Sequence, residues 1–98
     1  MGKASSMSKY KKKLIPILKR NGVVKAGIFG SVARGEEKKS SDIDVLIKVM
    51  GRKFSLLDLI GLEMELEKIL HRKVDLLTYN SLHPLLKKQI LEEEVRII

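Results

Sequence analysis

The order of three segments constrains the fold of this chain more than any other feature. Residues 43–49 form an apolar, β-branched run, residues 55–71 have the pattern of a helix, and residues 74–78 form another β-rich run. A strand, a helix and a second strand in this order form a β-α-β unit, whose strands lie parallel. We therefore expect an α/β (α+β) fold with a small mixed β-sheet flanked by helices.

The central helix has a clear start. Ser55-Leu56-Leu57-Asp58 has the pattern of a capping box, and the basic residues near His71 suit a helix C-terminus. An apolar stripe for the core follows inside this helix, comprising Leu59, Leu62, Leu66, Ile69 and Leu70.

The flanking segments supply further elements. An amphipathic helix is predicted over residues 8–20, although Pro16 should kink or split it. Residues 23–29 are β-rich and end at Gly30, and residues 31–34 could form one helical turn. Near the C-terminus, a helix should begin at Pro84 with Leu86, Ile90 and Leu91 on its apolar side, followed by a short strand over residues 95–98.

Length and charge limit the classes of protein to consider. With 98 residues the chain suits one domain, which we place at residues 8–98 behind a disordered leader at 1–7. The net charge of +8 attracts polyanions, while the four aromatic residues are too few for a stacking platform on single-stranded nucleic acid. The chain has no cysteine and no apolar run long enough for a membrane helix, so we expect a cytoplasmic protein without a membrane partner.

A Gly-Ser turn and a pair of carboxylates carry the chemistry. Gly30 and Ser31 end the first strand, where free backbone N–H groups and a hydroxyl could bind phosphate. Ten residues later, Asp42 and Asp44 point to one face of the next strand, because alternate strand residues share a face. Their mutual repulsion is relieved by a divalent cation, and carboxylates with phosphate oxygens suit Mg²⁺. Asp-x-Asp alone is a weak signal, because a pair of aspartates also caps loops at the start of a strand.

Two further residues complete the candidate site. Asp75 begins the third strand beside the second, so it should reach the same sheet edge as the Asp42–Asp44 pair, as a metal ligand or general base. An exposed aspartate at a strand end is the alternative. Arg34 could clamp phosphate with its planar guanidinium, or form a surface ion pair with Glu36 or Glu37. His71 and His83 are assigned to helix ends, and no P-loop pattern is present.

The motif Phe-Gly-Ser-Val-Ala-Arg-Gly-Glu, followed by Ser-Asp-Ile-Asp-Val-Leu, resembles the signature of the DNA polymerase β-like nucleotidyltransferase superfamily. In particular it is similar to the minimal nucleotidyltransferases (MNT) of archaea and bacteria, over nearly the whole chain. The resemblance implies two Mg²⁺ ions held by Asp42, Asp44 and Asp75, with Asp75 also helping to deprotonate an acceptor hydroxyl. It implies that Gly30 and Ser31 hold the triphosphate of a nucleoside triphosphate, usually ATP.

The resemblance also implies a biological role. MNT proteins of this size often act as antitoxins to a HEPN-domain toxin, in some cases by attaching AMP to it, so a HEPN protein is the expected partner. We keep two alternatives. The chain could neutralise a partner by complex formation without catalysis, or it could be a basic protein drawn to nucleic acid by charge alone, although nucleic acid is not the partner we expect.

Overall fold

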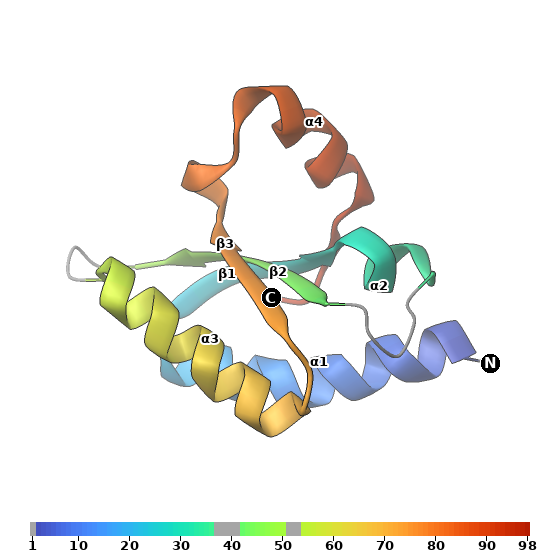
Figure 1. Cartoon of the computed structure of the whole chain (residues 1–98), viewed down its shortest axis with the longest axis horizontal. Coiled ribbons are helices and arrows are strands. Elements are labelled where there is room, and N and C mark those ends of the chain that lie inside the picture. The colour runs from blue at the N-terminus through green and yellow to red at the C-terminus, as the bar shows by residue number, and fades with distance from the viewer. Residues whose placement is uncertain (1, 37–41, 51–53) are drawn as a thin grey trace.

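The computed structural model describes residues 2–36, 42–50 and 54–98, with side chains from Met7 onward. A four-stranded sheet lies at the centre, with α1 and α3 on one face and α4 over the other (Figure 1). The elements are α1 (Gly2–Arg20), β1 (Val23–Phe29), α2 (Gly30–Arg34), β2 (Ile43–Val49), α3 (Leu56–Leu70), β3 (Val74–Thr78), a 3₁₀ turn η1 (Tyr79–Ser81), α4 (Pro84–Glu93) and β4 (Val95–Arg96).

The sheet is mixed, as predicted, with strand order β3-β2-β1-β4. Strands β2 and β3 run parallel, which confirms the β-α-β unit around α3. Strand β1 pairs antiparallel with β2 on one side and with the short β4 on the other. The C-terminal end of β1 therefore meets the N-terminal ends of β2 and β3 at one edge of the sheet.

Each face of the sheet is covered by its own apolar cluster. The larger one lies between the sheet and helices α1 and α3, and it includes Leu14, Ile28, Val45 and Leu66, all fully buried. The smaller cluster lies on the opposite face under α4, and its buried members are Phe29, Leu46 and Leu82. We call these surfaces the α1/α3 face and the α4 face. Strand β2 contributes to both, as its continuous apolar run predicted.

Helix α1 differs from the sequence prediction at two points. It begins at Gly2, so residues 2–7, expected to form a disordered leader, continue the helix. Good helix formers such as Ala4 and Met7, with no proline before position 16, let the helix extend. Pro16 does not split it, because Leu14, Ile17 and Leu18 on either side are anchored in the core.

The later helices largely follow their predicted bounds. Ser55 and Asp58 form the predicted capping box of α3, and Leu62, Leu66 and Leu70 are buried. Ile69 was assigned to the same stripe but is 37% exposed, because it lies at the side of the helix rather than beneath it.

Helix α4 begins at Pro84 as predicted, yet none of its residues is buried. Its predicted apolar side is only partly covered: Ile90 packs on the small cluster, whereas Leu86 is 52% exposed. Among the described helices, none has the length and apolar character needed to cross a membrane.

Candidate active site

The alternation of strand residues places the key carboxylates on the α4 face. In β2, Ile43 and Val45 belong to the core on the α1/α3 face, so Asp44 between them points to the opposite side. The same reasoning applies to Asp75 in β3, which lies between the buried Val74 and Leu76. Asp42 lies just before β2, and its charge acts on Asp44. That Asp42 and Asp44 share a face stays a prediction.

Strand register brings the predicted residues together. Phe29 of β1 is the partner of Asp44, and Asp44 is in turn the partner of Asp75, so these residues lie in one row across three strands. Gly30 follows Phe29 directly along the chain, at the end of β1. The antiparallel pairing of β1 with β2 thus brings the Gly30-Ser31 turn to the same sheet edge as Asp44 and Asp75. Asp75 is exposed, as the alternative of an aspartate at a strand end also predicted.

Gly30 makes room for the carboxylate of Asp44. Its φ is +75°, in the left-handed region that side chains disfavour. A Cβ atom at this position would lie 2.2 Å from Oδ2 of Asp44. The absence of a side chain therefore lets the turn and the carboxylate approach each other closely, and any larger residue would force Asp44 to move.

The electrostatics of the site bear on cation binding. Burial, followed by the negative charges of Asp75 and then Asp42, raises the pKa of Asp44 to about 6. Arg34 acts in the opposite direction and lowers that pKa. The charges of Asp75 and Asp42 therefore add to burial in disfavouring the ionised form of Asp44, and this is the conflict that a bound cation removes.

Helix α2 carries Arg34 at its last turn, closed by Gly35 in the left-handed conformation. The Arg34 guanidinium donates from Nε to Oε1 of Glu36 at 2.9 Å and from Nη1 to Oε1 of Glu93 at 2.8 Å. The predicted alternative of an ion pair with Glu36 is thus present, while Glu37 lies outside the described residues. Arg34 therefore reaches any phosphate only by exchanging these partners.

The donor set fits a hard cation. The site offers carboxylate oxygens from Asp42, Asp44 and Asp75, the ligand type that Mg²⁺ prefers. Within residues 2–36, 42–50 and 54–98, however, no group of three or more acidic, histidine or cysteine side chains is already arranged to hold a metal. The charge coupling at Asp44 and the oxygen donors fit Mg²⁺, but the side chains are not in place around a common point.

Sequence reasoning missed two glutamates on the α4 face. Glu93 pairs with Arg34 across 59 positions of sequence. Glu94 accepts a hydrogen bond from the Tyr79 hydroxyl and occupies the space left by Gly27, whose Cβ would lie 2.1 Å from Oε2. Burial and this hydrogen bond raise the pKa of Tyr79. A glycine inside a strand was the available signal, because it often marks a close approach.

The remaining candidates are outside the site. His71 caps the C-terminus of α3, and His83 is the N-cap of α4, where its Nδ1 accepts a hydrogen bond from the Leu85 amide at 3.1 Å. Both histidines therefore occupy helix ends, as predicted. Lys48 is exposed near the far end of β2.

Known proteins resemble this chain in both sequence and fold. Residues 12–98 match the polymerase β nucleotidyltransferase family model. The MJ0435 protein of Methanocaldococcus jannaschii, named for protein adenylyltransferase activity, is 53% identical over 93 residues, covering 95% of this chain and 99% of the relative. A solved minimal nucleotidyltransferase has 34% identity and a TM-score of 0.78, covering 97% of this chain and 95% of its own.

A more distant structure shares the fold. It contains a tri-AMPylated HEPN toxin from Shewanella oneidensis in complex with an MNT antitoxin. The matched chain has 20% identity and a TM-score of 0.74, with coverage of 93% of this chain and 71% of that one.

Proposed function

Because this chain belongs to the polymerase β nucleotidyltransferase family, we propose that it is a Mg²⁺-dependent protein adenylyltransferase. In this proposal it transfers AMP from ATP to a hydroxyl of a partner protein and acts as the antitoxin of a HEPN-type toxin. The adenylyltransferase name of the M. jannaschii relative and the AMPylated toxin in the S. oneidensis complex support the reaction and the partner.

One observation carries the proposal. The register of the sheet aligns the end of β1 with Asp44 and Asp75, so that the Gly30-Ser31 turn and these carboxylates meet at one edge of the sheet. The close contact of Gly30 with Asp44 leaves no side chain between them. Phosphate oxygens at the turn and a cation at the carboxylates would therefore be direct neighbours, which in-line nucleotidyl transfer requires.

In the proposed reaction, the acceptor hydroxyl oxygen forms a bond to the α-phosphorus of ATP. The bond from that phosphorus to the bridging oxygen of the β-phosphate breaks, and pyrophosphate leaves with the electron pair. Asp75, exposed at the rim of the site, receives the hydroxyl proton. The hydroxyl of Ser31 and the first N–H groups of α2 hold the triphosphate, and Arg34 contributes once it has left Glu36 or Glu93.

Asp42, Asp44 and Asp75 are the residues that would hold two Mg²⁺ ions. When bound, the ions supply charge neutralisation at the phosphates and increase the acidity of the attacking hydroxyl. Before ion binding, burial of Asp44 and, after it, the nearby charges of Asp75 and Asp42 raise the pKa of Asp44.

The test is a mass measurement on the partner. Wild-type protein, Mg-ATP and a HEPN toxin co-expressed or mixed with it should yield toxin heavier by one or more AMP units. The Asp42→Asn variant should give none, whereas Glu92→Gln, an equal loss of charge at an exposed position of α4, should match the wild type. An undiminished mass increase with Asp42→Asn would overturn the site assignment.

A second candidate function has one observation in its favour. Leu85 and Leu86 of α4 are 84% and 52% exposed, and they form an apolar surface suited to protein contact. Neutralisation by complex formation alone would use this surface without the carboxylates. Full neutralisation by a protein with Asp42, Asp44 and Asp75 all changed to alanine would select this function over catalysis.

A further inference from the structure

The positive charge of this protein is concentrated on one helix. Helix α1 carries seven of the 20 lysines and arginines and none of the 12 acidic residues, so it supplies nearly all of the net charge of +8. The rest of the chain is close to neutral. The charge is therefore a local property of α1 and not a general feature of the surface.

Five of these cations lie on one side of the helix. At 100° per residue they fall within an arc of roughly 120° and extend over about 17 Å of the helix axis. We call this set the basic stripe: Lys9, Lys12, Lys13, Lys19 and Arg20. The buried side of α1, which contains Tyr10, Leu14, Ile17 and Leu18, lies opposite. Packing of α1 against the sheet thus holds the basic stripe toward solvent.

The stripe is available for binding. All five residues are exposed. Among the ion pairs of the described residues, only Arg20 of this set takes part, with Glu65 of α3. Lys9, Lys12 and Lys13 also line a shallow hollow together with Ser8. The surface therefore combines uncompensated charge with a slight concavity.

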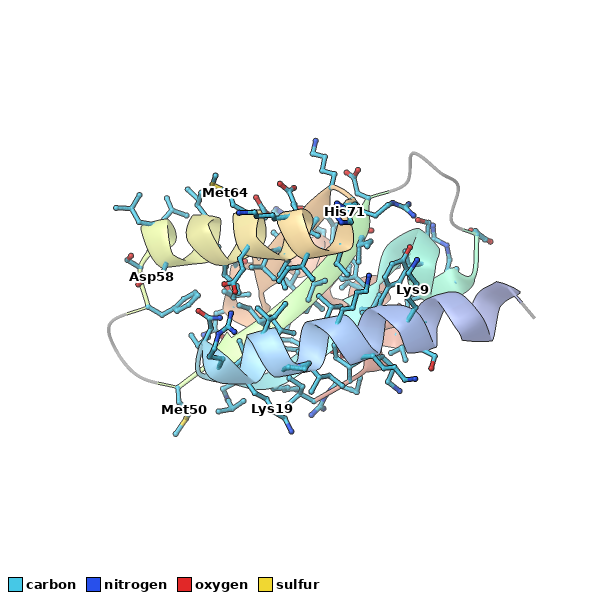
Figure 2. The ribbon with its side chains drawn as sticks, turned by 90° about the horizontal axis from the view of Figure 1, so that it is seen from below. Lys9, Lys19, Met50, Asp58, Met64 and His71 are labelled. Carbon is cyan, nitrogen blue, oxygen red and sulfur yellow. The ribbon has the colours of Figure 1, made fainter. Side chains whose placement is uncertain are left out.

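The stripe is separate from the candidate active site. Helix α1 packs on the α1/α3 face of the sheet, whereas Asp44 and Asp75 point to the α4 face. Figure 2 views the molecule from the side of α1 and α3, with Lys9 and Lys19 in the two halves of α1. A ligand on this surface would leave the α4 face open to nucleotide and partner protein.

We propose that the basic stripe binds the phosphodiester backbone of double-stranded nucleic acid without sequence preference. A row of exposed cations along a helix matches a row of phosphates, and such contacts need no aromatic residues. The small number of aromatic residues argues only against stacking on single strands. Membrane binding is disfavoured because the apolar side of α1 is buried in the core, which leaves none to insert into lipid.

The test measures duplex binding by fluorescence anisotropy in EDTA without ATP, so its result does not depend on catalysis. The probes are a short labelled RNA duplex and a DNA duplex of the same sequence. If all five cations contact phosphate, an about fourfold rise in salt should weaken wild-type binding by several hundredfold. Lys9→Gln/Lys12→Gln/Lys13→Gln should reduce that dependence to about tenfold.

The matched control removes three exposed lysines elsewhere, by Lys48→Gln/Lys87→Gln/Lys88→Gln. It should retain most of the affinity and the salt dependence. Equal weakening by both triple variants would reduce the effect to net charge and overturn the proposal. Tighter binding to polyglutamate or to anionic vesicles than to either duplex would also overturn it. Circular dichroism and thermal unfolding show that the variants are folded, and glutamine suits a helix as well as lysine does.

Discussion

At the residue scale, the carboxylate of Asp44 occupies the space that a side chain at position 30 would need. Oδ2 of Asp44 lies 2.2 Å from the position of a Cβ atom at residue 30. Gly22 offers a matched comparison, because its φ of +83° is similar and no atom lies within 4 Å of its Cβ position. Substitutions at the two glycines therefore distinguish the effect of backbone strain from the effect of displacing Asp44.

We expect Gly30→Ala and Gly22→Ala to destabilise the fold similarly, by about 1–2 kcal/mol, because each puts a side chain at positive φ. Only Gly30→Ala should also displace Asp44, and it alone should abolish calorimetric binding of Mg-ATP. Urea unfolding gives the first quantity. Wild-type affinity for Mg-ATP in Gly30→Ala would show that the close approach has no role in binding.

Asp44 predicts a dependence of stability on pH. Its pKa of about 6 lies above the ordinary value of 3.8, so the folded state binds the proton more tightly than the unfolded state. Metal-free stability from this group should therefore fall as pH rises from about 4 to about 6. Asp44→Asn removes this effect, and it should raise the stability by about 1 kcal/mol at pH 7.5 after allowance for partial exposure, but hardly at pH 4.

Thermal unfolding in EDTA at the two pH values measures this difference. Millimolar Mg²⁺ should stabilise the wild type and narrow the difference in stability between it and Asp44→Asn, because the bound ion neutralises the charge of Asp44. A variant that is less stable than the wild type at pH 7.5 in EDTA would contradict the assignment.

At the element scale, Arg34 links two helices that lie far apart in sequence. It closes α2, next to the Gly30-Ser31 turn, and pairs with Glu93 in the last turn of α4. Glu93 and Glu36 therefore compete with phosphate for one guanidinium. The position of α4 is coupled in this way to the residue that we expect to bind nucleotide.

This competition predicts opposite changes in Mg-ATP affinity for substitutions of Arg34 and of Glu93. Arg34→Gln should weaken binding of Mg-ATP, whereas Glu93→Gln should strengthen it by a few-fold, because Arg34 then loses a competing acceptor. Isothermal titration calorimetry distinguishes the two signs. Weaker binding in both variants would mean that the ion pair supports the site instead of competing with it.

At the scale of the whole molecule, the two faces of the sheet have different roles. The α1/α3 face holds most of the core, while the α4 face has a small apolar cluster beside the carboxylates. Leu82, just before α4, is 9% exposed and belongs to that cluster. Leu85 and Leu86 remain exposed, on the side of the sheet where the proposed reaction would receive its acceptor.

We expect Leu85→Gln/Leu86→Gln to weaken binding of a HEPN partner by at least about tenfold, since burial of exposed leucines at an interface contributes more than 1 kcal/mol. Binding of Mg-ATP should not change. Leu56→Gln/Leu57→Gln, at exposed positions of α3, is the matched control. Surface plasmon resonance with immobilised partner gives both affinities, and equal losses in the two variants would contradict docking at α4.

Much of the fold could be predicted because its signals are local. The β-branched run of β2, the capping box at Ser55 and the proline at the start of α4 each fix an element through backbone preferences of a few residues. The Gly30-Ser31 turn and the spacing of Asp42 and Asp44 were readable for the same reason. Helix α1 begins at Gly2 instead of near residue 8, because polar composition does not prevent a helix from extending.

The sequence by itself therefore determined the elements, the chemistry of the carboxylates and the total charge. Tertiary structure decided which further residues meet: Phe29 beside Asp44, Arg34 with Glu93, and Glu94 over Gly27. It also decided which apolar residues remain exposed and turned the cations of α1 outward. These outcomes depend on packing between segments distant in sequence, which the preferences of a single segment do not specify.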